Sequence, residues 1–291
     1  MIQTTTQPKS IFLKVVQFPV TRIVLALVFI GGLSTLVSLG LNALIRRLGL
    51  AATVPPVLIA LADVVVVCLA YALFVRVIER RVATEFSLRW LYELALGTAF
   101  GLVLFSVVIG ALWLLGSYQI IGSNPWQIVF SALWIGIVPG FVEEILFRGV
   151  LYRIIEESLG TWIALISTSF LFGFAHLANP GATLFSAVAI ALEAGLMLGI
   201  TYTLTRRLWL PIGIHFAWNF AQGGIYGVNV SGNEVNGWLK SQLVGPELIS
   251  GGSFGAEGSL VAVIICLLAF ALFLGMTLRR GNLVQPFWVR R

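Results

Sequence analysis

FVEEILFRGVL, residues 141–151, places two adjacent glutamates and an arginine inside an apolar run. A charged side chain at the centre of a membrane helix costs about 2.5–3.5 kcal/mol on insertion scales. Such side chains therefore usually face the interior of a helix bundle and have a function there. If the chain is a membrane protein, Glu143, Glu144 and Arg148 predict a bundle with a polar cavity between its helices.

The composition of the chain supports the membrane premise. Of its 291 residues, 59% are hydrophobic and only 10% are charged, and the mean hydropathy is +0.99. Soluble domains carry about 25% charged residues. Because so few charges cannot cover a water-facing surface, lipid must contact much of the protein. We expect an all-α, polytopic transmembrane helix bundle.

The apolar runs set the expected number of spans. A membrane-spanning helix needs about 20 mostly apolar residues. We expect eight spans, at residues 20–44, 52–75, 92–116, 126–150, 161–178, 183–204, 208–228 and 259–278. This divides the chain into N-terminal transmembrane helices (1–125), a helical core with the polar residues (126–228) and a C-terminal part (229–291). Residues 229–258 are rich in glycine and are expected to form an extended loop or a partly re-entrant lid.

The basic residues predict how the bundle is oriented. The net charge is +6, carried mostly in short loops, which is typical of topology signals and anionic lipid contact rather than nucleic-acid binding. With eight spans, the basic clusters Arg76, Arg80, Arg81, Arg89, Arg206, Arg207, Arg279, Arg280, Arg290 and Arg291 fall on the same side as Lys9 and Lys14 of the N-terminus. Arg46 and Arg47 fall on the opposite side. We expect a multi-pass protein of the plasma membrane with both termini in the cytoplasm and no nucleic-acid partner.

Helical spacing separates the two glutamates. Glu144 and Arg148 are four residues apart, so they share a helix face and can form an ion pair. Glu143 is rotated from Glu144 by about 100° and is the carboxylate left over. A carboxylate without a full partner in a low-dielectric pocket suits a general base or acid. The alternative is that all three residues form a structural polar contact between helices.

The two histidines of the chain also lie in apolar stretches. In FLFGFAHLANP, Phe172 precedes His176 by four residues, and in LPIGIHFAWNF, Asn219 follows His215 by four. A lone buried histidine is more often a hydrogen-bonded core residue than a catalyst. Two histidines, an amide and an unpaired glutamate on successive helices are harder to explain as core residues. An imidazole can hold a proton, the Asn219 amide can donate to an oxyanion, and Glu143 can accept a proton from water. These are the components of a hydrolytic site.

Three motifs carry a more specific resemblance. EEILFR fits Glu-Glu-x-x-x-Arg, FGFAH fits Phe-x-x-x-His and HFAWN fits His-x-x-x-Asn, in this order along the chain. Over residues 126–227 the sequence resembles the CAAX protease and bacteriocin-processing (CPBP) family of intramembrane peptidases, which is related to type II CAAX prenyl endoproteases. The N-terminal helices and the tail match that family only as membrane spans.

The resemblance implies roles for the residues at the motif positions. Glu143 corresponds to the catalytic glutamate that activates water with help from His176, and His215 and Asn219 fill the positions that stabilise the oxyanion. Glu144, Arg148 and Phe172 fill the supporting positions. The implied reaction is non-covalent hydrolysis of a peptide bond near the cytoplasmic face, in a membrane-associated or prenylated peptide or protein.

A metal cofactor stays open at this stage. One glutamate and two histidines make a possible zinc set, which here would be Glu143, His176 and His215. The metal-free glutamate mechanism of the family uses the same residues, and the zinc helix motif H-E-x-x-H is absent from the sequence. We assign no metal.

Other polar and small residues have weaker interpretations. Glu193 could face the same cavity or bond to a nearby backbone group, and Asp63 is expected in a helix-packing contact. The four-residue spacing of Gly195 and Gly199 suits close helix packing. Among Trp209, Trp218 and Trp238 we expect anchors at the membrane interface.

Two other functions compete with an endopeptidase. A non-catalytic membrane protein of the same fold, such as an immunity factor or a scaffold, would not require six matching polar residues. A transporter or proton channel would carry ionisable residues through the whole membrane thickness and often inverted repeats. The polar residues cluster and no repeat is visible in the sequence, which favours the peptidase.

Overall fold

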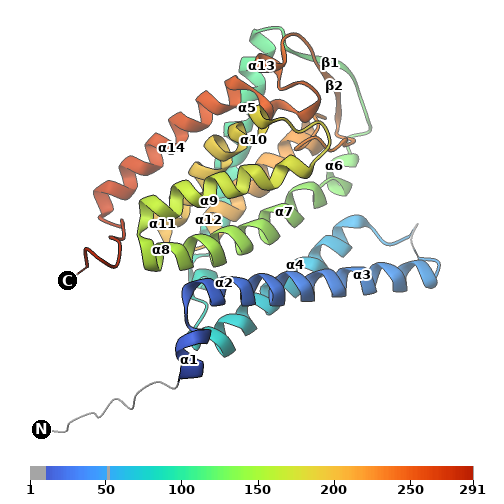
Figure 1. Cartoon of the computed structure of the whole chain (residues 1–291). Helices are drawn as coiled ribbons and strands as arrows, with labels where there is room; N and C mark the ends of the chain where they lie inside the picture. The colour runs from blue at the N-terminus through green and yellow to red at the C-terminus, as the bar shows by residue number, and fades with distance from the viewer. Residues whose placement is uncertain (1–10, 51–52, 291) are drawn as a thin grey trace, which may run out of the picture.

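The computed structural model describes residues 11–50 and 53–290, and almost all of its regular structure is helical (Figure 1). Within these residues seven helices are long and apolar enough to cross a membrane: Pro19–Arg47, Pro56–Glu79, Tyr92–Leu114, Ile128–Leu159, Thr161–Ala178, Leu184–Thr205 and Leu260–Arg280. The prediction of an all-α polytopic bundle is confirmed.

Several of these spans are composite, because π-helical or short irregular segments join shorter α-helices. The α-helices are α1 (Ile11–Val16), α2 (Pro19–Ala26), α3 (Gly32–Arg47), α4 (Pro56–Phe74), α5 (Tyr92–Leu114), α6 (Ile128–Ser131), α7 (Trp134–Glu144), α8 (Arg153–Leu159), α9 (Thr161–Ala175), α10 (Leu184–Ile190), α11 (Leu196–Thr205), α12 (Trp209–Asn219), α13 (Glu247–Ser250) and α14 (Leu260–Arg280).

The expected span at residues 208–228 is shorter than the sequence predicts. There α12 has 11 residues and continues as a π-helical segment of six, Phe220–Ile225. Nine of the α12 residues are buried, and the helix packs against α5, α7 and α11. This apolar run is therefore the central helix of the bundle, and its hydrophobicity reflects contact with protein rather than with lipid.

Glycines allow the neighbouring helices to approach α12 closely. A Cβ atom added at Gly136 of α7 would lie 2.2 Å from the carbonyl oxygen of Phe216, and one added at Gly97 of α5 would lie 2.4 Å from that of Leu210. Such small residues at helix interfaces let backbones come into contact within membranes. The approach at Gly136 brings the end of α7, with its two glutamates, next to α12.

Replacing Gly136 by alanine is expected to lower the stability of the bundle by about 1–3 kcal/mol, the usual cost of overpacking. The reason is that a backbone oxygen, which cannot rotate away, occupies the space of the new methyl group. Gly110→Ala in α5 is the matched control, because nothing lies within 4 Å of a Cβ atom there. Thermal unfolding in detergent measures both, and equal melting temperatures for the two variants would contradict the packing account.

The predicted close packing at Gly195 and Gly199 is confirmed. A Cβ atom at Gly195 would lie 2.7 Å from the Cβ of Ser169, and one at Gly199 would lie 2.7 Å from a methyl carbon of Leu165. Both neighbours belong to α9. These contacts hold α9 against the π-helical segment Ala191–Gly195 and α11.

Residues 229–258 form more structure than an extended loop. Strand β2 (Leu239–Leu243) pairs antiparallel with β1 (Tyr118–Ser123), and the two strands lie at one end of the bundle, beside α13 (Figure 1). The segment then returns to the helices through Gly255, whose φ of 115° requires glycine. The sequence did not predict this small sheet, because its strands are short and more than a hundred residues apart.

The opposite end of the bundle is joined by ion pairs. Arg22 and Arg153 each bond to Glu79 at 2.7 Å, and Arg206 pairs with Glu156. The start of α2 therefore meets three later spans where they end, on the side of the bundle that is expected to be basic. Arg46 and Arg47 end α3 away from them (Figure 1). Lys9, which belongs to the expected basic N-terminus, lies outside the described residues.

Candidate active site

The two glutamates of the opening stretch end α7, where the helix changes its geometry. Glu143 and Glu144 are its last residues, and the π-helical segment Ile145–Tyr152 follows at once and carries Arg148. Asn219 likewise ends α12 immediately before a π-helical segment. π-Helical segments are rare and occur frequently at functional sites, so the motif residues lie where the helices are least regular.

Glu144 is the centre of a buried hydrogen-bond network. It is 0% exposed, and its Oε1 accepts from Nη1 of Arg148 at 2.7 Å and from Nδ1 of His215 at 2.8 Å. The predicted ion pair between Glu144 and Arg148 is confirmed. Because a carboxylate at Nδ1 requires that nitrogen to carry the proton, Nε2 is the free nitrogen of neutral His215.

Arg148 connects this network to the neighbouring helices. Its Nη2 donates to the carbonyl oxygens of Ala194 at 3.0 Å and Gly195 at 3.3 Å. Its guanidinium carbon also lies 4.5 Å from the centre of the Phe172 ring, a distance typical of a cation–π contact. Arg148 thus contacts three groups of the site: the Glu144 carboxylate, the backbone at Ala194 and Gly195, and the Phe172 ring.

Glu143 is the carboxylate without a full partner, as the helical spacing predicts. Its Oε2 is buried and makes no hydrogen bond among the described residues, while the side chain as a whole is 31% exposed. That oxygen lies 3.9 Å from Nε2 of His215. The distance is too long for a direct hydrogen bond, and it suits a water that bonds to both atoms.

His176 lies at the C-terminal end of α9 and does not bond to Glu143. Its Nδ1 lies 2.8 Å from the carbonyl oxygen of Phe172, and since a carbonyl only accepts, Nδ1 carries the proton. The Phe172 ring centre lies 4.9 Å from that of His176 and 6.0 Å from that of His215. The predicted packing of Phe172 on His176 is confirmed, and the ring also separates the two imidazoles.

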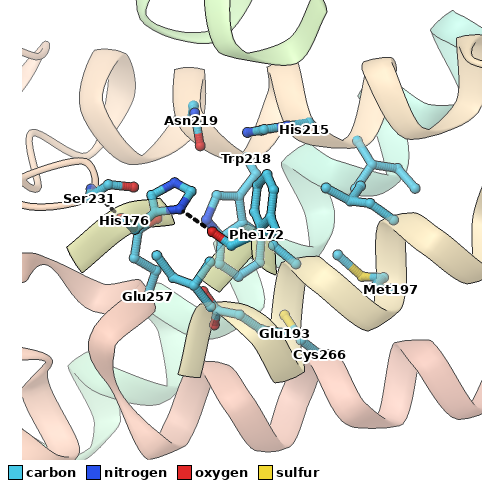
Figure 2. Close-up of a pocket in the computed structure, with 14 residues that line it drawn as sticks. Phe172, His176, Glu193, Met197, His215, Trp218, Asn219, Ser231, Glu257 and Cys266 are labelled. Carbon is cyan, nitrogen blue, oxygen red and sulfur yellow. Dashed lines mark hydrogen bonds between the residues drawn. The ribbon is translucent and has the colours of Figure 1, made fainter. Parts of the chain in front are cut away.

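A cavity joins these side chains between the helices. Figure 2 shows His215 and Asn219 pointing into it from α12, opposite Glu193 and Glu257, with Phe172 and His176 between them. Water-sized molecules have about 30 Å³ of free volume there, and about 10–15 Å³ is enough for one water. Glu143, Glu144 and Arg148 do not line this cavity, and Glu144 contacts it through His215.

Two of the cavity-lining residues, Glu257 and Trp218, were missed as site residues by the sequence-based analysis. Glu257 is 3% exposed, and burial raises its pKa. Trp218, a candidate interface anchor, is instead 7% exposed and faces the same cavity, while Trp238 is 40% exposed. Glu257 stands in a glycine-rich segment without helical periodicity, so no sequence signal placed it beside the core.

The two acidic residues that the sequence left with weaker interpretations, Glu193 and Asp63, differ in position. Glu193 is 2% exposed and faces the cavity, and its Oε2 has no hydrogen-bond partner among the described residues. Asp63 is half-buried on α4 and does not line the cavity. The structure therefore brings Glu193, but not Asp63, to the candidate site.

The zinc alternative does not fit the geometry of the described residues. Zinc requires three or four ligand atoms at about 2.0–2.3 Å from one point. Within residues 11–50 and 53–290, no three His, Cys, Asp or Glu side chains converge in that way. Nδ1 of His176 is also used for the Phe172 carbonyl, and His176 lines the cavity whereas Glu143 does not.

A comparison with protein-family models matches the part of the chain that holds the candidate site. Residues 124–221 fit the family model "Type II CAAX prenyl endopeptidase Rce1-like", and all seven motif residues fall inside that range. The "Putative membrane peptidase YdiL" of Bacillus subtilis (strain 168) is 27% identical over 136 residues, which is 47% of this chain and 50% of that protein. The chain thus spans about half the length of the curated relative it matches.

Proposed function

We propose that the chain is an intramembrane endopeptidase of the CPBP family in which Glu143 activates water, and the two matches support this proposal. The single observation that carries this proposal is the free Oε2 of Glu143, which faces Nε2 of an oriented histidine 3.9 Å away. A base needs a free lone pair in reach of the proton it removes.

The first step is attack of water on the carbonyl carbon of the scissile peptide bond. A water between Glu143 and His215 transfers a proton to the glutamate as its oxygen forms the new bond to carbon. Glu144 holds His215 with Nε2 facing that water, and Arg148 holds Glu144. These two residues act on the reaction through the histidine, and neither touches the substrate.

The second step is breakdown of the tetrahedral intermediate. The negative oxygen accepts a hydrogen bond from the Asn219 amide, which makes no hydrogen bond to another described residue. The carbon–nitrogen bond then breaks, and the proton held by Glu143 is transferred to the leaving amine. No covalent enzyme intermediate forms, and no metal takes part in the proposed sequence.

The proposed substrate is a membrane-associated or prenylated peptide, because the site lies among apolar helices long enough to cross a membrane. We also propose that the basic end of the bundle faces the cytoplasm, as the positive-inside rule favours. The test uses the full chain in lipid vesicles with a panel of prenylated and unprenylated membrane peptides. Mass spectrometry identifies the cut, and no cleavage of any peptide by the intact chain would contradict the proposal.

Substitution of Asn219 by alanine is expected to lower kcat by about 100- to 1,000-fold, as loss of one oxyanion donor does. KM should change little, because the amide is used mainly after attack. Asn233→Ala is the control, since Asn233 is an exposed asparagine outside the cavity. A loss confined to KM would assign Asn219 to substrate binding instead.

A further inference from the structure

Glu257 reaches the candidate site from a distant part of the chain. It lies in the 3₁₀ turn Ala256–Gly258, just before α14, and 38 residues after Asn219 in sequence. Its carboxyl group accepts the backbone N–H of Ser231, and its side chain lines the same cavity as Trp218. Trp218, His215 and Asn219 reach that cavity from α12, so Glu257 brings residues 229–258 to the cavity that this helix lines.

The group that Glu257 faces is His176. The two interact electrostatically, and Figure 2 shows them on the same wall of the cavity, next to Ser231. Phe172 holds Nδ1 of that imidazole, which leaves its other edge without a hydrogen-bond partner among the described residues. A carboxyl group beside an imidazole orients the ring and stabilises its protonated form.

Glu193 is in the same cavity but does not have these contacts. It is as buried as Glu257, at 2% against 3% exposure, and one of its oxygens has no partner in the described parts of the chain. It interacts electrostatically with Glu257, and the free volume between them suits one or two waters. The two glutamates thus differ in their contact with His176, which makes Glu193 a useful comparison.

We propose that Glu257 is a positioning residue for His176, and that the turn Ala256–Gly258 is therefore part of the active site. Only the kinetic consequence of this inference rests on the proposed peptidase function. The orientation of an imidazole can be measured without any substrate.

The substrate-free test uses ¹⁵N-histidine labelling of the whole chain in lipid. The chain has only two histidines, so the His215→Gln variant assigns both sets of imidazole signals. Glu257→Gln is expected to shift the His176 signals and to leave those of His215 in place. Equal shifts of the His176 signals in Glu257→Gln and Glu193→Gln would overturn the proposal, because they would report only a change of cavity charge.

The kinetic test uses the peptide panel. The family resemblance assigns His176 to assisting Glu143 in water activation. Glu257→Gln should therefore lower kcat by about 10- to 100-fold, as loss of a residue that orients a functional histidine does, with KM nearly unchanged. Glu257→Asp should recover part of that loss, and Glu247→Gln, an exposed glutamate of the same segment, should behave as the wild type. An unchanged kcat in Glu257→Gln would overturn the proposal. Inactivity of the wild type would contradict the peptidase function, while the spectra would still decide the positioning.

Discussion

Glu143→Gln is expected to lower the rate of peptide cleavage by about 100- to 10,000-fold, the contribution of a general base. Glutamine keeps the size and shape of the side chain but has no carboxylate to accept the water proton. Because Oε2 of Glu143 has no partner among the described residues and lies 3.9 Å from Nε2 of His215, we expect the loss at the chemical step, in which water is deprotonated. Binding of an uncleaved peptide should be unchanged, because substrate contact is not the proposed role of Glu143.

The matched control for this variant is Asp63→Asn. It also removes an acidic group within a membrane span, but Asp63 lies on α4, whereas Glu143 lies 3.9 Å from His215. Its cleavage rate should stay within a few-fold of the wild type. If Glu143→Gln were as active as Asp63→Asn, Glu143 would not be the base.

Arg148→Met is expected to destabilise the protein by about 3–5 kcal/mol, since removing one partner of a buried ion pair leaves an uncompensated charge. Glu144 is 0% exposed and Arg148 is 2% exposed, so water cannot replace the lost partner. Methionine retains much of the volume of the arginine stem. The measurement is thermal or denaturant unfolding in detergent, with the cleavage rate recorded in parallel.

The double variant Glu144→Gln with Arg148→Met separates charge from packing. With both charges gone, its stability should be closer to the wild type than that of Arg148→Met alone, because no buried charge lacks a partner. Arg279→Met, at an exposed end of α14, should change stability by less than about 0.5 kcal/mol. A double variant no more stable than Arg148→Met would contradict the ion-pair account.

The parts of the site that depend on local geometry could be predicted from the sequence. The pair Glu144–Arg148 and the contact of Phe172 with His176 both follow from side chains four residues apart on one helix. The unpaired state of Glu143 follows from the same geometry. These features require only that the segment be helical, which the apolar composition already indicates.

The parts that depend on tertiary packing could not be predicted. The bond from His215 to Glu144 exists because Gly136 lets α7 touch α12 at Phe216, and helical spacing contains no information on that contact. The pairing of β1 with β2 and the arrival of Glu257 likewise join distant segments. The length of α12 was overestimated because a buried helix and a membrane span are equally apolar.

The central claim is that Glu143 activates water to cut a peptide bond. Its most direct test is mass spectrometry of the peptide panel after incubation with purified wild type or Glu143→Gln in vesicles, each with and without a chelator. The account predicts one defined cut by the wild type, insensitive to the chelator, and none by the variant. The same cut at the same rate by both proteins would contradict it.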